Sequence, residues 1–169
     1  MWRLRREDAV AVEPFARFFE PLRKSVVIAC EPGQAFGVFT ERMGTWWPLT
    51  GYSLFRERAV HCGIEPNVGG EVFEMKDDGE RCVWGRVLEW APPDRLVLSW
   101  HPGLSPEQAQ EVEIRFTPVA GGTRVDLEHR DWHQLGDRAP DLRESYDGGW
   151  DSVLARFATH ACDVEEGTS

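Results

Sequence analysis

The C-terminal stretch from Tyr146 to Asp163 constrains the fold most, because it carries one long helical pattern after a chain of mostly strand-like segments. On a helix of about 3.6 residues per turn, apolar side chains at spacings of three and four form a single stripe. A lone amphipathic helix at the end of a strand-rich chain needs a sheet to cover that stripe. The residues of the stripe are Tyr146, Trp150, Val153, Leu154, Phe157 and Ala161.

Two adjacent glycines, Gly148 and Gly149, interrupt this helical pattern. Glycine lowers helix propensity. We therefore expect the pair either near the start of the helix or where its backbone meets a neighbouring segment closely.

The preceding chain predicts one strand, a short helix over 34–43 that ends at Gly44, and then about six antiparallel strands joined by tight turns. The two last strands alternate apolar and polar residues, as expected for a sheet with one buried and one wet face. A curved sheet around a terminal helix leaves a gap wherever side chains do not fill it, and that gap is the natural ligand site. The expected strands span 25–30, 59–62, 71–75, 81–90, 95–100, 111–116 and 123–129.

Length and charge limit the domain count and the partners. The chain has 169 residues and 41% apolar content, which suits one domain over 25–163, with an N-terminal arm over 1–24 and a disordered tail over 164–169. A formal charge of −10 argues against nucleic acid and anionic membranes as partners. The sequence contains no apolar run long enough to span a bilayer, so we expect no membrane insertion. The four cysteines are scattered, which fits reduced thiols in a cytoplasmic protein.

Six motifs are distributed along the chain: GTWWP at 44–48, GGEVFE at 69–74, GRVLEWAPPDRLVLSW at 85–100, EVEIRFTP at 111–118, GGTRVDLEHRDW at 121–132 and GGWDSVLARFA at 148–158. As a set they resemble the SRPBCC superfamily of START-related, pollen-allergen-like helix-grip proteins, specifically its bacterial branch related to the activator of heat-shock-protein ATPase. The resemblance covers roughly residues 25–161. It implies a curved antiparallel sheet around a long C-terminal helix, with an apolar cavity between them.

The resemblance implies a fold and leaves the activity open, because one fold serves many functions. The superfamily includes lipid and hormone binders, aromatase/cyclase-like enzymes and a co-chaperone domain. No shared catalytic set carries over to this chain.

Aromatic residues supply most candidates for the cavity wall, with core packing as the competing interpretation for each of them. The candidate ligand-binding residues are Trp46, Trp47, Phe73, Trp84, Arg86, Trp100, Ile114, Phe116, His129, Trp132, Trp150 and Leu154.

Strand parity ties Arg86 to Trp84. If Trp84 points inward, strict alternation turns Arg86 inward too, where a guanidinium needs an acid partner or a ligand carboxylate. If both point outward, Arg86 is a solvated strand residue, which we favour because burying an unpaired charge is costly.

His129 is the weak catalytic candidate. It ends a strand on the buried parity and could act as a general acid or base, or it could be a structural histidine hydrogen-bonded to loop backbone. The histidines and cysteines show no metal-site spacing, glycines form no nucleotide-binding motif, and no cofactor is expected. We interpret Glu107, Glu111 and Glu113 as a solvated face.

Three functions remain open at this point. The primary hypothesis is a module that binds a small hydrophobic or aromatic molecule in the cavity. The second is a cyclase-, dehydratase- or hydrolase-like enzyme that uses an inward ionisable residue in the same cavity. The third is an interaction protein with a chaperone partner, and a homodimer through the N-terminal arm is a further alternative.

Overall fold

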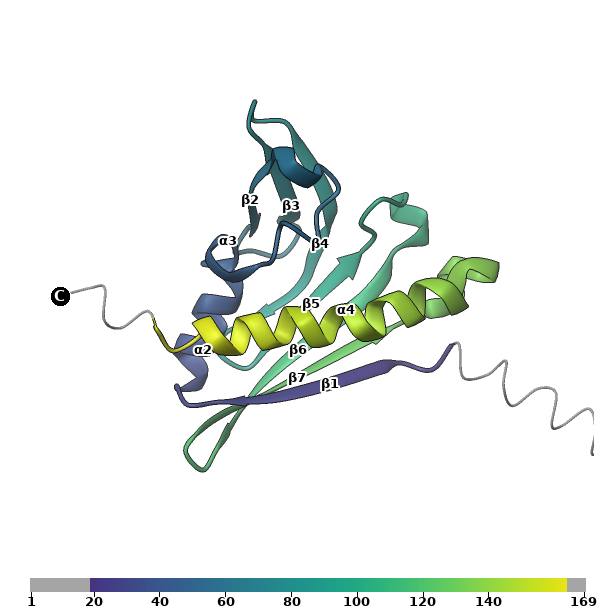
Figure 1. Ribbon diagram of the computed structural model, residues 1–169. Helices are drawn as coiled ribbons and strands as arrows, with labels where there is room; N and C mark the ends of the chain where they lie inside the picture. Colours follow the sequence, from purple (N-terminus) through teal and green to yellow (C-terminus); the bar gives the residue numbers. More distant parts are fainter. Residues whose placement is uncertain (1–18, 164–169) are drawn as a thin grey trace, which may run out of the picture.

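The computed structural model describes residues 19–163 and shows a seven-stranded sheet curled around one long helix (Figure 1). The strand order is β1-β7-β6-β5-β4-β3-β2, and every neighbouring pair is antiparallel. This confirms the predicted α+β helix-grip architecture. The strands are β1 (Leu22–Ile28), β2 (Ala59–Ile64), β3 (Glu71–Lys76), β4 (Arg81–Ala91), β5 (Arg95–Trp100), β6 (Gln110–Val119) and β7 (Gly122–Arg130).

The first strand begins at Leu22, three residues before the predicted start of the domain. Leu22 is buried and pairs with His129 of β7, so the strand already belongs to the sheet there. The polar residues Arg23 and Lys24 concealed this start, because they occupy an edge strand that is half open to water.

Two short helices, α2 (Pro32–Thr40) and α3 (Met43–Trp46), follow β1 in place of the single predicted helix. Gly44 does not end a helix; it lies inside α3. A Cβ atom there would lie 2.6 Å from the His61 ring and 3.1 Å from the Cys62 carbonyl oxygen, so glycine favours the close packing of α3 on β2. The 3₁₀ helices are η1 (Arg56–Arg58), η2 (Pro106–Gln108) and the longer η3 (Trp132–Arg138).

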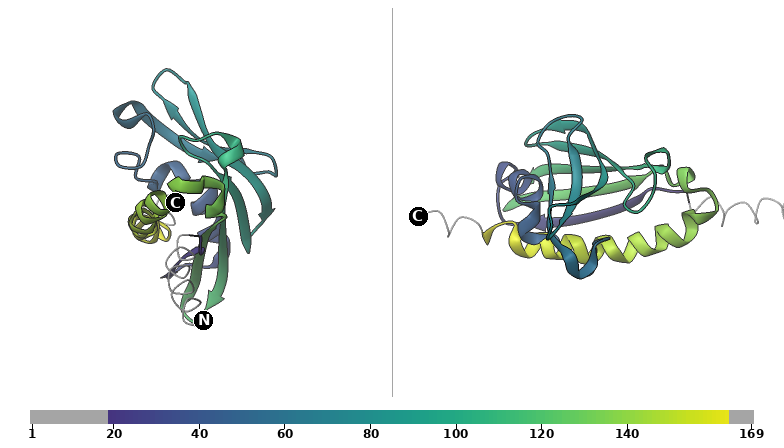
Figure 2. Two further views of the ribbon diagram at one scale, coloured as in Figure 1. Left: turned by 90° about the vertical axis from the view of Figure 1, so that its right-hand side faces the viewer. Right: turned by 90° about the horizontal axis from the view of Figure 1, so that it is seen from above.

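The long helix α4 (Ala139–His160) crosses the concave face of the sheet (Figures 1 and 2). Its C-terminal half packs tightly: the Phe157 ring lies 5.2 Å from Phe39 and 5.1 Å from Trp46, and Phe157 is fully buried. Its N-terminal half does not fill the space above the sheet, and a cavity remains between the two.

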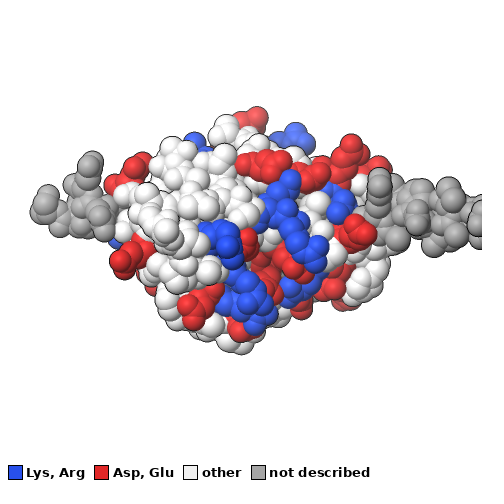
Figure 3. Space-filling view, turned by 90° about the horizontal axis from the view of Figure 1, so that it is seen from below, with Lys and Arg blue, Asp and Glu red and all other residues white. Residues whose placement is uncertain are grey.

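The outer face of the sheet carries interleaved positive and negative side chains, part of which Figure 3 shows from below. At their centre, Glu113 is only 7% exposed and pairs with Arg95, Arg115 and Arg130. Burial by itself would raise the pKa of Glu113, but hydrogen bonds from the three guanidinium groups outweigh it and lower the pKa to about 2. The prediction that Glu113 belongs to a solvated face was therefore wrong.

Candidate functional site

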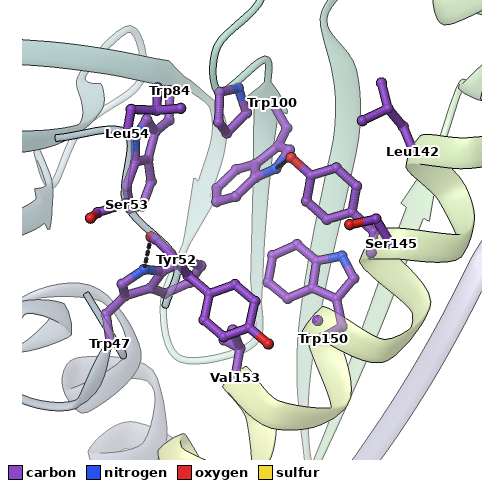
Figure 4. A pocket seen from close by; sticks show the side chains of 13 residues that line it. Trp47, Tyr52, Ser53, Leu54, Trp84, Trp100, Leu142, Ser145, Trp150 and Val153 are labelled. Carbon is purple, nitrogen blue, oxygen red and sulfur yellow. Dashed lines mark hydrogen bonds between the residues drawn. The ribbon is translucent and has the colours of Figure 1, made fainter. Parts of the chain in front are cut away.

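A cavity of about 230 Å³ lies between the N-terminal half of α4, strands β4 and β5, and the loop before β2 (Figure 4). This volume is below the roughly 300–1,000 Å³ common for ligand clefts, so it suits a small molecule better than a long lipid. One side opens to solvent beside Tyr52 and Leu54, which are 38% and 45% exposed. The lining residues are Trp47, Tyr52, Ser53, Leu54, Trp84, Trp100, Pro102, Leu142, Ser145, Tyr146, Gly149, Trp150 and Val153.

Four tryptophans form the wall, and each comes from a different element. Trp47 follows α3, Trp84 lies in β4, Trp100 ends β5 and Trp150 lies in α4. Their ring centroids are 5.2 to 6.2 Å apart for neighbouring pairs, the spacing of aromatic rings in contact. The four rings therefore make a continuous aromatic surface.

Every indole N–H of this wall donates to a protein group. Trp47 donates to the Tyr52 carbonyl at 2.9 Å and Trp84 to a Glu74 carboxylate oxygen at 2.9 Å. Trp100 donates to the Tyr146 hydroxyl at 3.1 Å, and Trp150 donates to His129 Nδ1 at 3.0 Å. Because their donors are occupied, the indoles offer a ligand their ring faces and edges.

The polar groups left at the cavity are hydroxyls. They belong to Tyr52, Ser53, Ser145 and Tyr146, and among residues 19–163 no Asp, Glu, Lys, Arg or His lines the cavity. Burial raises the pKa of Tyr146 to about 12, against the hydrogen bond from Trp100, which lowers it. The phenol therefore stays protonated at neutral pH, and its hydroxyl can donate a hydrogen bond to a ligand oxygen.

The segment Tyr52–Leu54, which we call the strap, crosses one side of the cavity. Buried Glu74 fixes its end by accepting the backbone N–H groups of Leu54 at 2.5 Å and Phe55 at 3.2 Å. Since Trp84 donates to the same carboxylate and Trp47 to the strap carbonyl of Tyr52, the strap and two of the wall indoles share one hydrogen-bond network.

His129 lies behind the wall and does not line the cavity. It is fully buried; its Nε2 donates to Gln110 Oε1 at 3.1 Å, while Nδ1 accepts from Trp150. These partners assign the neutral tautomer protonated at Nε2. Burial lowers the pKa of His129 to about 3, so the imidazole stays neutral and orients Trp150. His129 is thus a structural histidine. Its ring nitrogens bond to side chains of β6 and α4, whereas the structural interpretation of the sequence predicted bonds to loop backbone.

The structure places four of the twelve sequence-predicted site residues at the cavity: Trp47, Trp84, Trp100 and Trp150. Trp132 is buried against the His129 ring at 4.0 Å, and Phe73 lies outside the cavity under the Arg81 guanidinium at 3.8 Å. Four more are at most 2% exposed and belong to the packed core without lining the cavity: Trp46, Ile114, Phe116 and Leu154.

Trp84 and Arg86 do not share a face, which corrects the parity argument. Trp84 is buried, whereas the Arg86 side chain is 56% exposed and donates to the Gly69 carbonyl at 3.0 Å. The register shifts between Val72 and Phe73, so β4 has one extra residue there, a β-bulge that resets the alternation.

Sequence reasoning missed the strap and the first turns of α4. Tyr52, Ser53 and Leu54 lie in the loop between the expected short helix and the expected strand at 59–62, and Leu142 and Ser145 precede the helical stripe. The one available signal was the aromatic Tyr52 within that loop.

The described part of the chain contains neither a metal-binding cluster nor a membrane-spanning helix. No group of three or more His, Cys, Asp or Glu side chains lies together as a metal site. None of the described helices combines the length and apolarity needed to cross a membrane.

Comparisons with known proteins identify relatives of the whole domain. The family model described as "Activator of Hsp90 ATPase homolog 1-like protein" matches residues 29–161. A solved anthrahydroquino-gamma-pyrone synthase, Txn09, in complex with a molecule designated SUM, is 40% identical; the alignment covers 82% of this chain and 95% of that one, with a TM-score of 0.59. No curated protein sequence matches.

Two further solved structures show the same fold. The self-sacrificing resistance protein CalC from Micromonospora echinospora is 28% identical over 90% of this chain and 99% of its own, with a TM-score of 0.62. The Aha1 dimer from Colwellia psychrerythraea is 15% identical over 88% and 99%, also with a TM-score of 0.62, a likeness of fold alone. With the family model matching most of the described domain, the chain belongs to the activator of Hsp90 ATPase homolog 1-like family of the SRPBCC superfamily.

Proposed function

We propose that this protein binds a flat, uncharged aromatic small molecule in the cavity beneath the N-terminal half of α4. The observation that carries the proposal is the wall of four indoles whose N–H groups are all occupied by protein acceptors. Such a wall gains affinity by burying and stacking aromatic surface. The hydroxyls of Ser145, Tyr146 and Tyr52 then orient oxygen atoms at the ligand's edge.

One relative supports a fused-ring aromatic ligand that bears oxygen. The 40%-identical structure is named as a synthase of an anthrahydroquino-gamma-pyrone, a name that describes fused aromatic rings bearing oxygen. Such a compound is flat and carries its polar atoms on its edges, which matches stacking walls and hydroxyls at the cavity mouth.

The lining argues for an uncharged ligand. A carboxylate in this cavity would have no cationic partner among the described residues, and burying an unpaired charge is costly. The formal charge of −10 adds unfavourable long-range repulsion for an anion.

Titration of intrinsic tryptophan fluorescence with two matched probes tests the proposal. We expect 1,8-dihydroxyanthraquinone to quench the indoles and to bind at least about tenfold more tightly than anthraquinone-2-carboxylate, a difference of ~1.4 kcal/mol. Calorimetry confirms the affinities independently of fluorescence. Equal affinity for both probes, or no binding of the neutral one, would refute the proposal.

A pair of leucine substitutions locates the binding site. Leu142 lines the cavity, whereas Leu88 lies on β4 outside it and is 45% exposed. We expect Leu142→Asp to weaken binding of the neutral probe by about tenfold or more, because the ligand then desolvates a carboxylate. Leu88→Asp adds the same charge elsewhere and should leave the affinity unchanged.

Ring closure on the bound molecule is the second candidate, favoured by the 40% identity to a synthase. Holding a nucleophile against its target can accelerate such a step without an ionisable catalytic group. A 1-hydroxyanthraquinone with a 1,3-diketone side chain at position 2 tests it. The phenolic oxygen would bond to the distal ketone carbon and one water would leave, giving a γ-pyrone. Chromatography should show this product forming faster with protein than in buffer; equal rates exclude the activity.

Three broader expectations also stand as proposals. We infer a cytoplasmic protein, and we name a second copy of the chain or a chaperone as alternative partners that would act through the surface. The predicted N-terminal arm lies largely outside the described residues. A chain that starts at Phe19 keeps β1 intact, so light scattering of this variant and the full chain tests whether the arm mediates a dimer.

A further inference from the structure

The strap is anchored at both ends, and its Tyr52 side chain lies against α4. Glu74 holds Leu54, and the Leu54 side chain lies 3.4 Å from where a side chain on Gly103 would begin. At the other end Trp47 holds the Tyr52 carbonyl. Between these anchors the Tyr52 ring reaches across the mouth towards α4 (Figure 4), where it meets Gly149.

The contact between Tyr52 and α4 depends on the absence of a side chain at position 149. A Cβ atom there would lie 3.3 Å from Tyr52 Cε1, tighter than ordinary van der Waals contact. Tyr52 is 38% exposed, so it would yield by moving outward, away from the cavity. Glycine is unfavourable inside a helix compared with alanine, so the close approach gives position 149 a reason for glycine.

Gly148 provides the internal comparison. It lies in the same helix, one residue away, and a Cβ atom there would meet nothing within 4 Å. The two glycines therefore share the same helix-propensity effects. They differ in that Gly149 lines the cavity and a side chain there would meet Tyr52, so only the comparison with and without Tyr52 separates a direct effect on the cavity from an effect through the strap.

We propose that Gly149 sets the width of the cavity mouth by letting the Tyr52 ring close against α4, and that this pair restricts the cavity to flat ring systems. The inference rests on the proposed binding function and adds the residues that determine its shape selectivity. A flat molecule fits between the Tyr52 ring and the indole wall, while a bulky three-dimensional molecule would force Tyr52 off the helix.

Two matched substitution series test the inference: Gly149→Ala and Gly149→Leu against Gly148→Ala and Gly148→Leu. The Gly148 variants should bind 1,8-dihydroxyanthraquinone as the wild type does, and Gly148→Ala should raise the Tm by about 2–4 °C through helix propensity. Gly149→Ala should weaken binding by about threefold and Gly149→Leu by more than about tenfold, because overpacking displaces Tyr52. Thermal unfolding verifies that all four variants remain folded.

A double-mutant cycle tests whether Gly149 acts through Tyr52. In a Tyr52→Ala background, Gly149→Leu should cost little further affinity. A hydroxytriptycene probe, which holds three rings on a non-planar frame, should bind the wild type poorly and gain affinity in Tyr52→Ala. Equal losses from Gly149→Leu in both backgrounds, or equal losses in the 148 and 149 series, would overturn the inference.

The outcomes separate this inference from the proposed function. If wild-type protein does not bind the flat neutral probe, the proposed function fails and the inference fails with it. If wild type binds the probe but the Gly149 series behaves like the Gly148 series, only the inference fails.

Discussion

Mild acid should destabilise this protein through a single buried imidazole. His129 is fully buried in neutral form between Gln110 and Trp150, and within residues 19–163 its side-chain hydrogen bonds and ring contacts are all to uncharged groups. Burial lowers its pKa from 6.5 to about 3 in the folded protein. Between these two values the unfolded chain binds a proton that the folded protein excludes, so the free energy of unfolding falls as pH falls.

The size of this effect follows from the two pKa values. Stability from the neutral imidazole is fully present above pH 6.5 and declines by up to ~1.4 kcal/mol for each pH unit below it. At pH 5 the expected loss is therefore about 2 kcal/mol relative to pH 7. The strongly shifted carboxylate Glu113 contributes little over this range, because its share of the stability is lost only as the pH falls from its ordinary pKa of 4.5 towards about 2.

Urea unfolding at pH 7 and pH 5, followed by circular dichroism, measures the difference. His129→Asn and His129→Gln cannot titrate, and each can preserve one of the two hydrogen bonds of His129, so at least one should remain folded. We expect the wild type to lose about 2 kcal/mol more than either variant between the two pH values. If wild type and a folded variant lose the same amount, another group carries the acid sensitivity and the argument is wrong.

The remaining predictions concern the wall, the strap, the outer face and the core. His129→Gln should weaken binding of 1,8-dihydroxyanthraquinone several-fold more than His129→Asn, because an asparagine oxygen can replace Nδ1 as acceptor for Trp150; equal affinities in titration would contradict the positioning role. Glu74→Gln leaves fewer acceptors for the three donors around it, so binding should weaken about three- to tenfold while circular dichroism stays unchanged. Glu113→Gln should cost about 3 kcal/mol in urea unfolding at pH 7, with the difference from wild type shrinking as pH approaches 2. Phe157→Ala should cost about 3–5 kcal/mol in the same assay, and a loss below 1 kcal/mol would mean that the helix is not packed as described.

The sequence predicted the fold well because its periodic signals were long. The stripe of α4 and the alternation in β6 and β7 extend over enough residues to identify a buried face, and Ile114, Leu127 and Phe157 are all buried as expected. Local boundaries were less accurate where sequence signals conflict with packing. Gly44 is an example: it suggested a helix end, whereas its role is to let α3 approach His61.

The site was predicted only in part, because cavity walls depend on where packing fails. Trp46 and Trp47 are adjacent in sequence, yet one fills the core and the other lines the cavity. Both are tryptophans in the same short motif, so the local sequence does not distinguish the core residue from the cavity residue. Tyr52 reaches the cavity only because Glu74, twenty-two residues later, holds the strap in place, and such a contact between distant segments leaves no periodic signal.

The bulge in β4 makes the cavity wall sensitive to chain length. One additional residue in β4 relative to β3 lets Trp84 face inward while Arg86, two positions later, faces water. The residues on either side of this bulge are thus out of phase, and deleting a single residue between them would restore the alternation across this point, although β4 has a second register shift against β5 between Val87 and Glu89. Such a deletion would turn either Trp84 or the following apolar residues from the buried face of the sheet to the solvent, even though no residue is substituted. In this region insertions and deletions should therefore be tolerated far less well than conservative replacements.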